Sequence, residues 1–253
     1  MSTPARARSR ELRDVRTAAE RRRKKRIRLA AGGGGVLIVA LLAAIVISLV
    51  NAAGGSGEST APRGRTAAPA IATTSGALAL GSAAAPVRLA VYLDYMCPFC
   101  GRFEQANSAE LNRLVADGTV RLELYPLSFL DRMSSGTEYS TRASNATATV
   151  ADHAPGKVLA FNTALFARQP AEGSRGLSDD EIAALARDAG VPQDVVNLFT
   201  DRIFEPWVTA STAAVFEAGI SGTPTVKIND EVFKGDLYTA GPLTAAIVAA
   251  KGS

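Results

Sequence analysis

Cysteine and histidine are scarce in this sequence, and their scarcity excludes several kinds of site. The 253 residues contain two cysteines, Cys97 and Cys100, and one histidine, His153. Two cysteines cannot build a framework of structural disulfides. Three soft ligands cannot complete a four-ligand zinc site within one chain, so no metal and no cofactor are expected. Covalent haem attachment is excluded as well, because Gly101 stands where a histidine would be needed.

An excess of positive charge is absent from most of the chain, although the net charge is +4. Residues 1–28 hold 12 Arg and Lys against 3 acids, and the remainder holds 16 basic against 21 acidic residues, a net charge of −5. The basic excess is therefore confined to a short tail. Because the main body carries no basic field, the sequence predicts no nucleic-acid partner.

Charged residues are missing altogether from the 29 positions between Arg28 and Glu58. About 20 apolar residues are enough for a helix to cross a membrane, so we predict a transmembrane anchor at 29–51. The basic tail, residues 1–28, directly precedes it, which favours a cytoplasmic N-terminus and places the rest of the chain outside the cell membrane. A cleavable signal peptide is the alternative, since Val50-Asn51-Ala52 resembles a cleavage site. Either arrangement exports the domain.

The remaining residues divide into a linker and one α/β domain. Residues 52–76 are mostly Gly, Ala, Ser, Thr and Pro, which is typical of a flexible linker. Residues 77–253 begin with a strand, a helix and a second strand, and end with a hairpin and a helix. A helical insertion at about 137–219 separates these two parts. Outside the insertion we expect strands at 87–95 and 120–126, helices at 98–117 and 242–250, and the hairpin at 225–234.

The pair Cys97 and Cys100 lies at the start of the first predicted helix, which favours redox chemistry. A sulfur atom at a helix N-terminus is stabilised as thiolate by unpaired N–H groups and the helix dipole. Cys97 is therefore the predicted nucleophile, and Cys100, one turn later, the resolving thiol. Pro98 suits the first helical turn, where its missing N–H costs nothing. A structural disulfide and half of a metal site are the competing interpretations, and both are disfavoured by the short loop and the shortage of ligands.

Two motifs far apart carry a resemblance to a known family. The segment Asp94–Cys100 (DYMCPFC) and, far downstream, Gly219–Val226 (GISGTPTV) resemble the DsbA-like branch of the thioredoxin superfamily. The resemblance implies a thioredoxin-like fold with an inserted all-helical lobe. It also implies that Pro224 is a cis-proline beside the nucleophile and that Thr223 offers backbone hydrogen bonds to an extended substrate peptide.

The sequence departs from this family pattern at two positions. A buried acid six residues before the first cysteine assists proton transfer in many thioredoxin-like proteins, but this chain has Val91 there. Asp94 and Glu123 are the candidates to replace it. The second residue between the cysteines is Phe99 and not histidine, so the thiolate has less support and we expect a milder oxidant.

The expected function is that of an extracytoplasmic thiol-disulfide oxidoreductase that introduces disulfides into exported proteins with free thiols. By the resemblance, a membrane protein of the DsbB or VKOR type would reoxidise the cysteine pair. A reductase or isomerase with the same fold is one alternative, because only the reduction potential separates these activities. A tethered peptide-binding chaperone is the other.

Overall fold

The computed structural model describes residues 67–252, which form an α/β domain around a five-stranded sheet. The predicted basic tail at 1–28, the predicted anchor at 29–51 and most of the predicted linker lie outside the described residues. Within the described part, no helix is long and apolar enough to cross a membrane.

The sheet has the strand order β1-β3-β2-β4-β5, with β2 in the middle. Strand β2 runs parallel to β3 and antiparallel to β4, while β1 and β5 pair antiparallel at the two edges. Both faces of β2 are buried, as the continuous apolar pattern of this segment predicts. The strand bounds are Leu78–Leu80 (β1), Val87–Asp94 (β2), Val120–Leu127 (β3), Thr225–Ile228 (β4) and Glu231–Val232 (β5).

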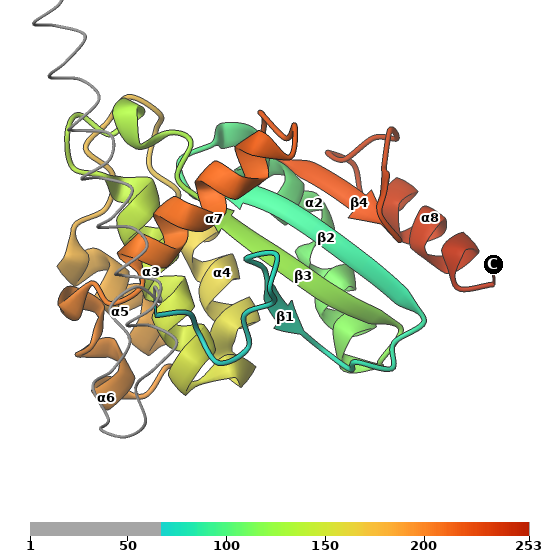
Figure 1. Ribbon diagram of the computed structural model, residues 1–253, viewed down its shortest axis with the longest axis horizontal. Coiled ribbons are helices and arrows are strands. Elements are labelled where there is room, and N and C mark those ends of the chain that lie inside the picture. The colour runs from blue at the N-terminus through green and yellow to red at the C-terminus, as the bar shows by residue number, and fades with distance from the viewer. Residues whose placement is uncertain (1–66, 253) are drawn as a thin grey trace, which may run out of the picture. The chain divides into compact units, whose positions relative to one another are not determined.

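Three helices cover the sheet. In Figure 1, α2 (Pro98–Ala116) lies behind the sheet, and α7 (Glu205–Glu217) crosses in front of the ends of β2 and β3. Helix α8 (Pro242–Ala250) lies next to β4 and contacts α2. The chain enters α2 directly from β2, so the segment with both cysteines stands at the carboxyl end of the central strand.

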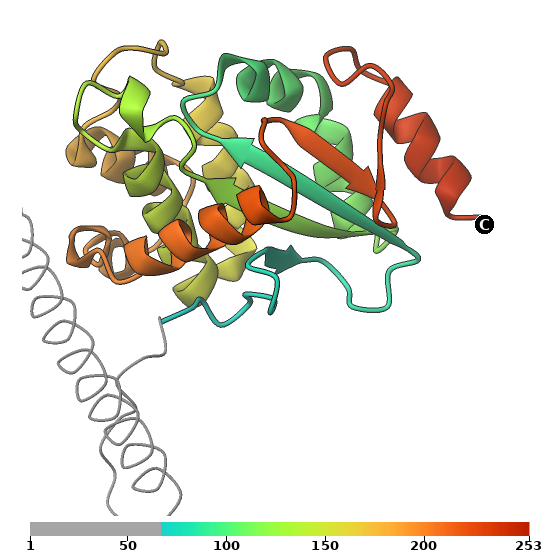
Figure 2. The ribbon, with the colours of Figure 1, turned by 45° about the horizontal axis from the view of Figure 1, so that its top comes forward.

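The predicted helical insertion forms a separate lobe. Figures 1 and 2 show its helices gathered beyond the carboxyl ends of β2 and β3, on the side away from α8. Residues 168–178 of the insertion are not helical, although a helical insertion was expected throughout 137–219. Pro206 lies in the first turn of α7, where it does not interrupt the helix. The lobe comprises α3 (Tyr139–His153), α4 (Val158–Ala167), α5 (Asp179–Asp188) and α6 (Gln193–Val196), with 3-10 turns at Asp131–Met133, Pro155–Lys157 and Phe199–Asp201.

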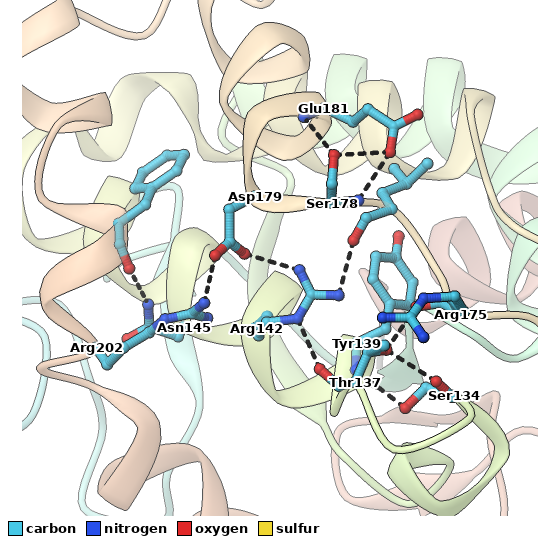
Figure 3. Close-up of polar contacts among 12 residues, drawn as sticks. Ser134, Thr137, Tyr139, Arg142, Asn145, Arg175, Ser178, Asp179, Glu181 and Arg202 are labelled. Carbon is cyan, nitrogen blue, oxygen red and sulfur yellow. Dashed lines mark hydrogen bonds and ion pairs between the residues drawn. The ribbon is translucent and has the colours of Figure 1, made fainter.

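A cluster of charged side chains joins the parts of this lobe (Figure 3). Asp179, the first residue of α5, accepts from Arg142 Nη1 of α3 at 2.7 Å and from Arg202 Nη2 at 2.6 Å. A capping box begins α5, since the side chains of Ser178 and Glu181 accept from each other's backbone N–H groups. Arg202 lies just before α7, whose end leads into the loop with Pro224, so the cluster connects the lobe to the start of that helix.

The segment before β1 differs from the prediction. Residues 67–76 fall in the predicted flexible linker, yet they contact the domain. Ala70 N donates to Asp152 Oδ1 at 2.6 Å, and Ser211 Oγ donates to Gly76 O at 2.9 Å. Ile71 is partly buried against the core. Ordered contacts therefore begin before residue 77.

Candidate active site

The two cysteines lie where β2 turns into α2, and they differ in accessibility. Cys97 is the N-cap residue of α2 and is 6% exposed, whereas Cys100 is fully buried. The turn is closed by Cys97 N, which donates to Asp94 O at 3.0 Å. The carbonyl of Cys97 then accepts from Cys100 N at 2.9 Å, which begins the helix. Both cysteines are free thiols, so the structure represents the reduced pair.

The surroundings shift the pKa values of the two thiols in opposite directions. A hydrogen bond from the Cys100 thiol is the largest cause that lowers the pKa of Cys97 to about 6. Partial burial opposes this shift, and the Thr223 side chain and the N–H groups of Phe99 and Cys100 support it. Burial raises the pKa of Cys100 well above its ordinary value. The arrangement thus favours a thiolate at Cys97 and a protonated thiol at Cys100 at neutral pH.

The second predicted motif meets the first one in space. Strand β4 pairs with β2 so that Thr225 lies opposite Tyr92, which brings the loop before β4 to the end of the central strand. The Thr223–Pro224 peptide bond is cis. The thiol of Cys97 donates to Thr223 O at 3.3 Å, although 126 residues separate the two in sequence. The backbone of Thr223 therefore lies directly beside the sulfur of Cys97.

Asp94 and Glu123, the candidates for the acid missing at Val91, have other surroundings. The carboxylate of Asp94 accepts from Met96 N and Leu130 N at 2.9 Å each and from Ser140 Oγ at 2.6 Å. Burial is the main cause that raises its pKa to about 6. Three donors to one carboxyl group indicate a structural bridge between β2, the loop after β3, and α3.

Glu123 lies on the wrong face of the sheet for this role. It pairs with Ala90, and its charge adds to the burial that raises the pKa of Tyr92, a residue of the apolar cluster on the face away from the cysteines. Val91 and the two cysteines belong to the other cluster. Of the two candidates, Glu123 is therefore not placed to replace the acid missing at Val91.

The comparison with known families agrees with this geometry. A family model described as thioredoxin matches residues 73–247, which is more than half of the chain and includes both motifs. The chain is a DsbA-like member of the thioredoxin superfamily. The resemblance inferred from the two motifs is thereby confirmed.

Solved structures of thiol-disulfide oxidoreductases are similar to this DsbA-like protein. MdbA of Actinomyces oris has a TM-score of 0.64 at 26% identity, and the match covers 76% of this chain and 97% of that one. The disulfide bond oxidoreductase DsbG of Mycobacterium tuberculosis has a TM-score of 0.62 at 26% identity, with coverage of 72% and 91%. DsbA of M. tuberculosis has a TM-score of 0.61 at 26% identity, with coverage of 70% and 93%. The chain is a protein thiol-disulfide oxidoreductase.

Curated relatives include a much longer protein. The serine/threonine-protein kinase PknE of M. tuberculosis is 32% identical over 155 residues, which is 58% of this chain. The matched stretch is only 27% of the kinase. This oxidoreductase thus resembles one part of that protein.

The helical lobe of the oxidoreductase holds the active-site turn through three side chains, Gln169, Asn162 and Thr147, which the sequence analysis did not assign to the site. Gln169 Nε2, after α4, donates to Cys97 O at 2.8 Å and to Tyr95 O at 3.1 Å. The hydroxyl of Tyr95 donates to Asn162 Oδ1 at 3.0 Å and accepts from Thr147 Oγ1 at 2.9 Å. Gln169 lies 72 positions after Cys97 in the sequence, and only the folded lobe brings it to the cysteines.

Two exposed aromatic residues, Phe99 and Tyr238, form an aromatic rim beside the cysteines. Phe99 is 49% exposed, and its ring centroid lies 6.0 Å from that of Tyr238. The Arg102 guanidinium lies 4.6 Å from the Tyr238 ring centroid. Asn107 Nδ2 donates to Leu237 O at 2.8 Å and so holds the loop with Tyr238 against α2. The predicted motif residue Phe99 is therefore part of an aromatic surface.

The remaining candidate residues have structural positions. His153 ends α3 and pairs with Asp152 at 3.3 Å. Trp207 is buried in the core, where its ring packs with apolar side chains. Among residues 67–252, no three His, Cys, Asp or Glu side chains are grouped so that they could hold a metal ion.

Proposed function

We propose that this oxidoreductase forms disulfide bonds in exported proteins, with Cys97 as the reacting sulfur and Cys100 as its resolving partner. The observation that carries the proposal is the position of Cys97 Sγ. It lies at the N-terminus of α2, between the buried thiol of Cys100 and the carbonyl of Thr223, 3.3 Å away. Cys97 keeps a small exposed surface, at 6%, whereas Cys100 has none, so Cys97 is the cysteine that a protein substrate can approach.

The reaction would proceed by two thiol-disulfide exchanges. A substrate thiolate attacks Cys97 Sγ of the oxidised pair, which breaks the Cys97–Cys100 bond and forms a mixed disulfide. Cys100 leaves as a thiolate and takes up a proton, in keeping with its raised pKa. The second substrate thiolate then attacks the mixed disulfide, so the substrate gains a disulfide and Cys97 leaves as a thiolate.

The pKa of Cys97 supports oxidation of substrates as the favoured direction. A thiol with a pKa of about 6 is a good leaving group at neutral pH, and a stabilised thiolate favours the reduced form of the pair. Substrate oxidation ends in this reduced form. Phe99 adds no ring nitrogen that could stabilise the thiolate further, so we expect a milder oxidant than a relative with histidine there.

Substrate peptides would bind along the loop with the cis-proline. The backbone of Thr223 lies beside Cys97, and an extended peptide can pair with such a segment by adding a strand. Backbone pairing ignores side chains, which suits an enzyme that acts on many unfolded proteins.

The location and the reoxidising partner belong to the same proposal. The apolar segment 29–51 and the basic tail before it support a membrane anchor with the catalytic domain outside. The two electrons taken from each substrate must leave the cysteine pair, and a membrane protein of the DsbB or VKOR type would accept them.

A redox titration of the full chain against glutathione tests the direction. We expect a potential above the glutathione poise, towards the value of about −120 mV typical of strong oxidants. A value near about −270 mV would instead identify a reductase.

Trapping in cells tests the roles of the cysteines. Cys100→Ala should accumulate mixed disulfides between Cys97 and exported proteins, and the double variant that also carries Cys97→Ala should accumulate none. Equal trapping by both variants would contradict the assignment. Unchanged insulin-reduction or ribonuclease-refolding activity of Cys97→Ala would favour a chaperone.

A further inference from the structure

A cavity opens beside the active-site helix α2. It has a volume of about 490 Å³ and lies between α2 and α4. Pro98 and Gly101 line the end near the thiols, and Phe166 and Gln169 line the side of the lobe. Cavities of this volume hold small molecules or several side chains. A polypeptide joined to Cys97 would pass close to its mouth, because Pro98 directly follows that cysteine.

A buried acid without a counter-ion also lines this cavity. Glu104 of α2 is only 8% exposed, and Thr163 Oγ1 donates to its Oε1 at 2.8 Å. None of the ion pairs among residues 67–252 includes Glu104. Burial raises the pKa of Glu104, and the hydrogen bonds from Thr163 and Asn162 oppose that rise only in part. A buried carboxylate without a cation is costly, so a cation brought by a ligand would be bound favourably.

Arg102 also lines the cavity, but its charged group interacts elsewhere. Its guanidinium lies 4.6 Å from the ring centroid of Tyr238 and 5.8 Å from that of Phe99. The hydrogen bond from Thr239 is the main cause that lowers the pKa of Asp236, and the charge of Arg102 adds to it. The guanidinium of Arg102 thus contacts the aromatic rim, and Glu104 has no counter-ion among residues 67–252.

The other walls suit the stem of a long basic side chain. Pro98, Phe166 and Ala167 contribute apolar surface, while Gln105 and Ser108 contribute polar groups. Lysine and arginine bury their methylene stems against apolar surface and keep the charged head on polar groups. The cavity offers both kinds of surface, with the acid among its lining residues.

We propose that this cavity is a substrate subsite that binds a lysine or arginine side chain close to the reacting cysteine, with the charged head paired to Glu104. The proposal rests on the function proposed above, because it assumes that Cys97 reacts with substrate thiols. It adds a side-chain preference to backbone pairing at Thr223.

The subsite is tested with a pair of cysteine-containing peptides that differ only at one residue next to the cysteine. One carries lysine and the other norleucine, which has a stem of the same length and no charge. The rate at which each peptide reduces the oxidised full chain is measured for the unmodified protein, for Glu104→Gln and for Glu123→Gln. Glu123→Gln is the matched control, since it removes an acid from the opposite face of the sheet.

We expect the unmodified chain and Glu123→Gln to react about tenfold faster with the lysine peptide, and Glu104→Gln to react equally with both; tenfold corresponds to about 1.4 kcal/mol. Ala167→Lys gives a second test that leaves the buried carboxyl intact. It places a cation at an exposed position in the cavity wall and should also abolish the preference.

Equal rates for both peptides with the unmodified chain would overturn the subsite, and so would a lysine preference that survives in Glu104→Gln and Ala167→Lys. Dithiothreitol, which is too small to need the cavity, separates the two proposals. Normal oxidation of dithiothreitol without a lysine preference rejects the subsite alone. Failure to oxidise dithiothreitol rejects the proposed function and the subsite with it.

Discussion

Removing the thiol of Cys100 should raise the pKa of Cys97, because a hydrogen bond from that thiol is the largest cause of the lowered value. With a pKa of about 6, roughly 90% of Cys97 is thiolate at pH 7, against about 3% for an ordinary thiol with a pKa of about 8.5. The largest possible loss of thiolate in Cys100→Ala is therefore about 30-fold. The observed loss should be smaller, since Thr223 and the N–H groups of the first turn of α2 remain.

The assay is the rate of alkylation of Cys97 by iodoacetamide as a function of pH. Each variant has one thiol, so the assignment is unambiguous. The midpoint of the curve reports the pKa, whereas the maximal rate also reflects nucleophilicity, which falls with the pKa. Cys100→Ser keeps an O–H donor at the same place and should have a midpoint between those of the reduced unmodified protein and Cys100→Ala. If both variants kept a midpoint of about 6, the helix N-terminus would be the cause, and our account of the two thiols would be refuted.

Three further predictions concern stability, measured by denaturant unfolding. Because the folded pKa of Cys97 lies below its unfolded value, the free energy of unfolding of the reduced protein should rise between pH about 6 and about 8.5, relative to the oxidised protein; parallel curves would contradict the lowered pKa. Asp94→Asn should lower the free energy of unfolding by about 1–3 kcal/mol, because the NH2 group of asparagine would face one of the three buried donors and leave it without an acceptor. An unchanged free energy would argue against the structural bridge between β2, the loop after β3 and α3. Gly176→Ala should lower the free energy of unfolding more than Gly136→Ala. Both glycines have positive φ, but only a Cβ atom at position 176 would clash with the Tyr139 ring. Equal losses would show that the ring can move.

The sequence predicted the main strands and helices because their signals are local. Alternating apolar residues mark β2 and β3, and a capping box marks the start of α5. The hairpin predicted at 225–234 is correct as well, and its turn residues Asn229 and Asp230 both have positive φ. Strand β1 was not predicted, because three residues are too few to establish a period. Its existence depends on the pairing of Leu78 with Leu124.

The candidate site was predicted less completely than the fold. The short spacing between Cys97 and Cys100 and their position at the start of a predicted helix were enough to identify them. The contacts of Gln169 and Glu104 depend on how the lobe packs against α2, and no local pattern reports that packing. Glu123 illustrates the same limit, since the sequence shows its type and strand but tertiary packing decides which face is near the thiols.

The bond network of Tyr95 has a consequence for genetics. Thr147 and Asn162 are buried, yet through the Tyr95 hydroxyl they help to hold the turn on which the reacting sulfur stands. Alleles that alter these buried lobe positions would produce the phenotype of a damaged redox centre while both cysteines remain intact. A screen for loss of oxidative folding would therefore recover mutations scattered over the helical insertion, and their distance from the cysteine codons would not mark them as bystanders.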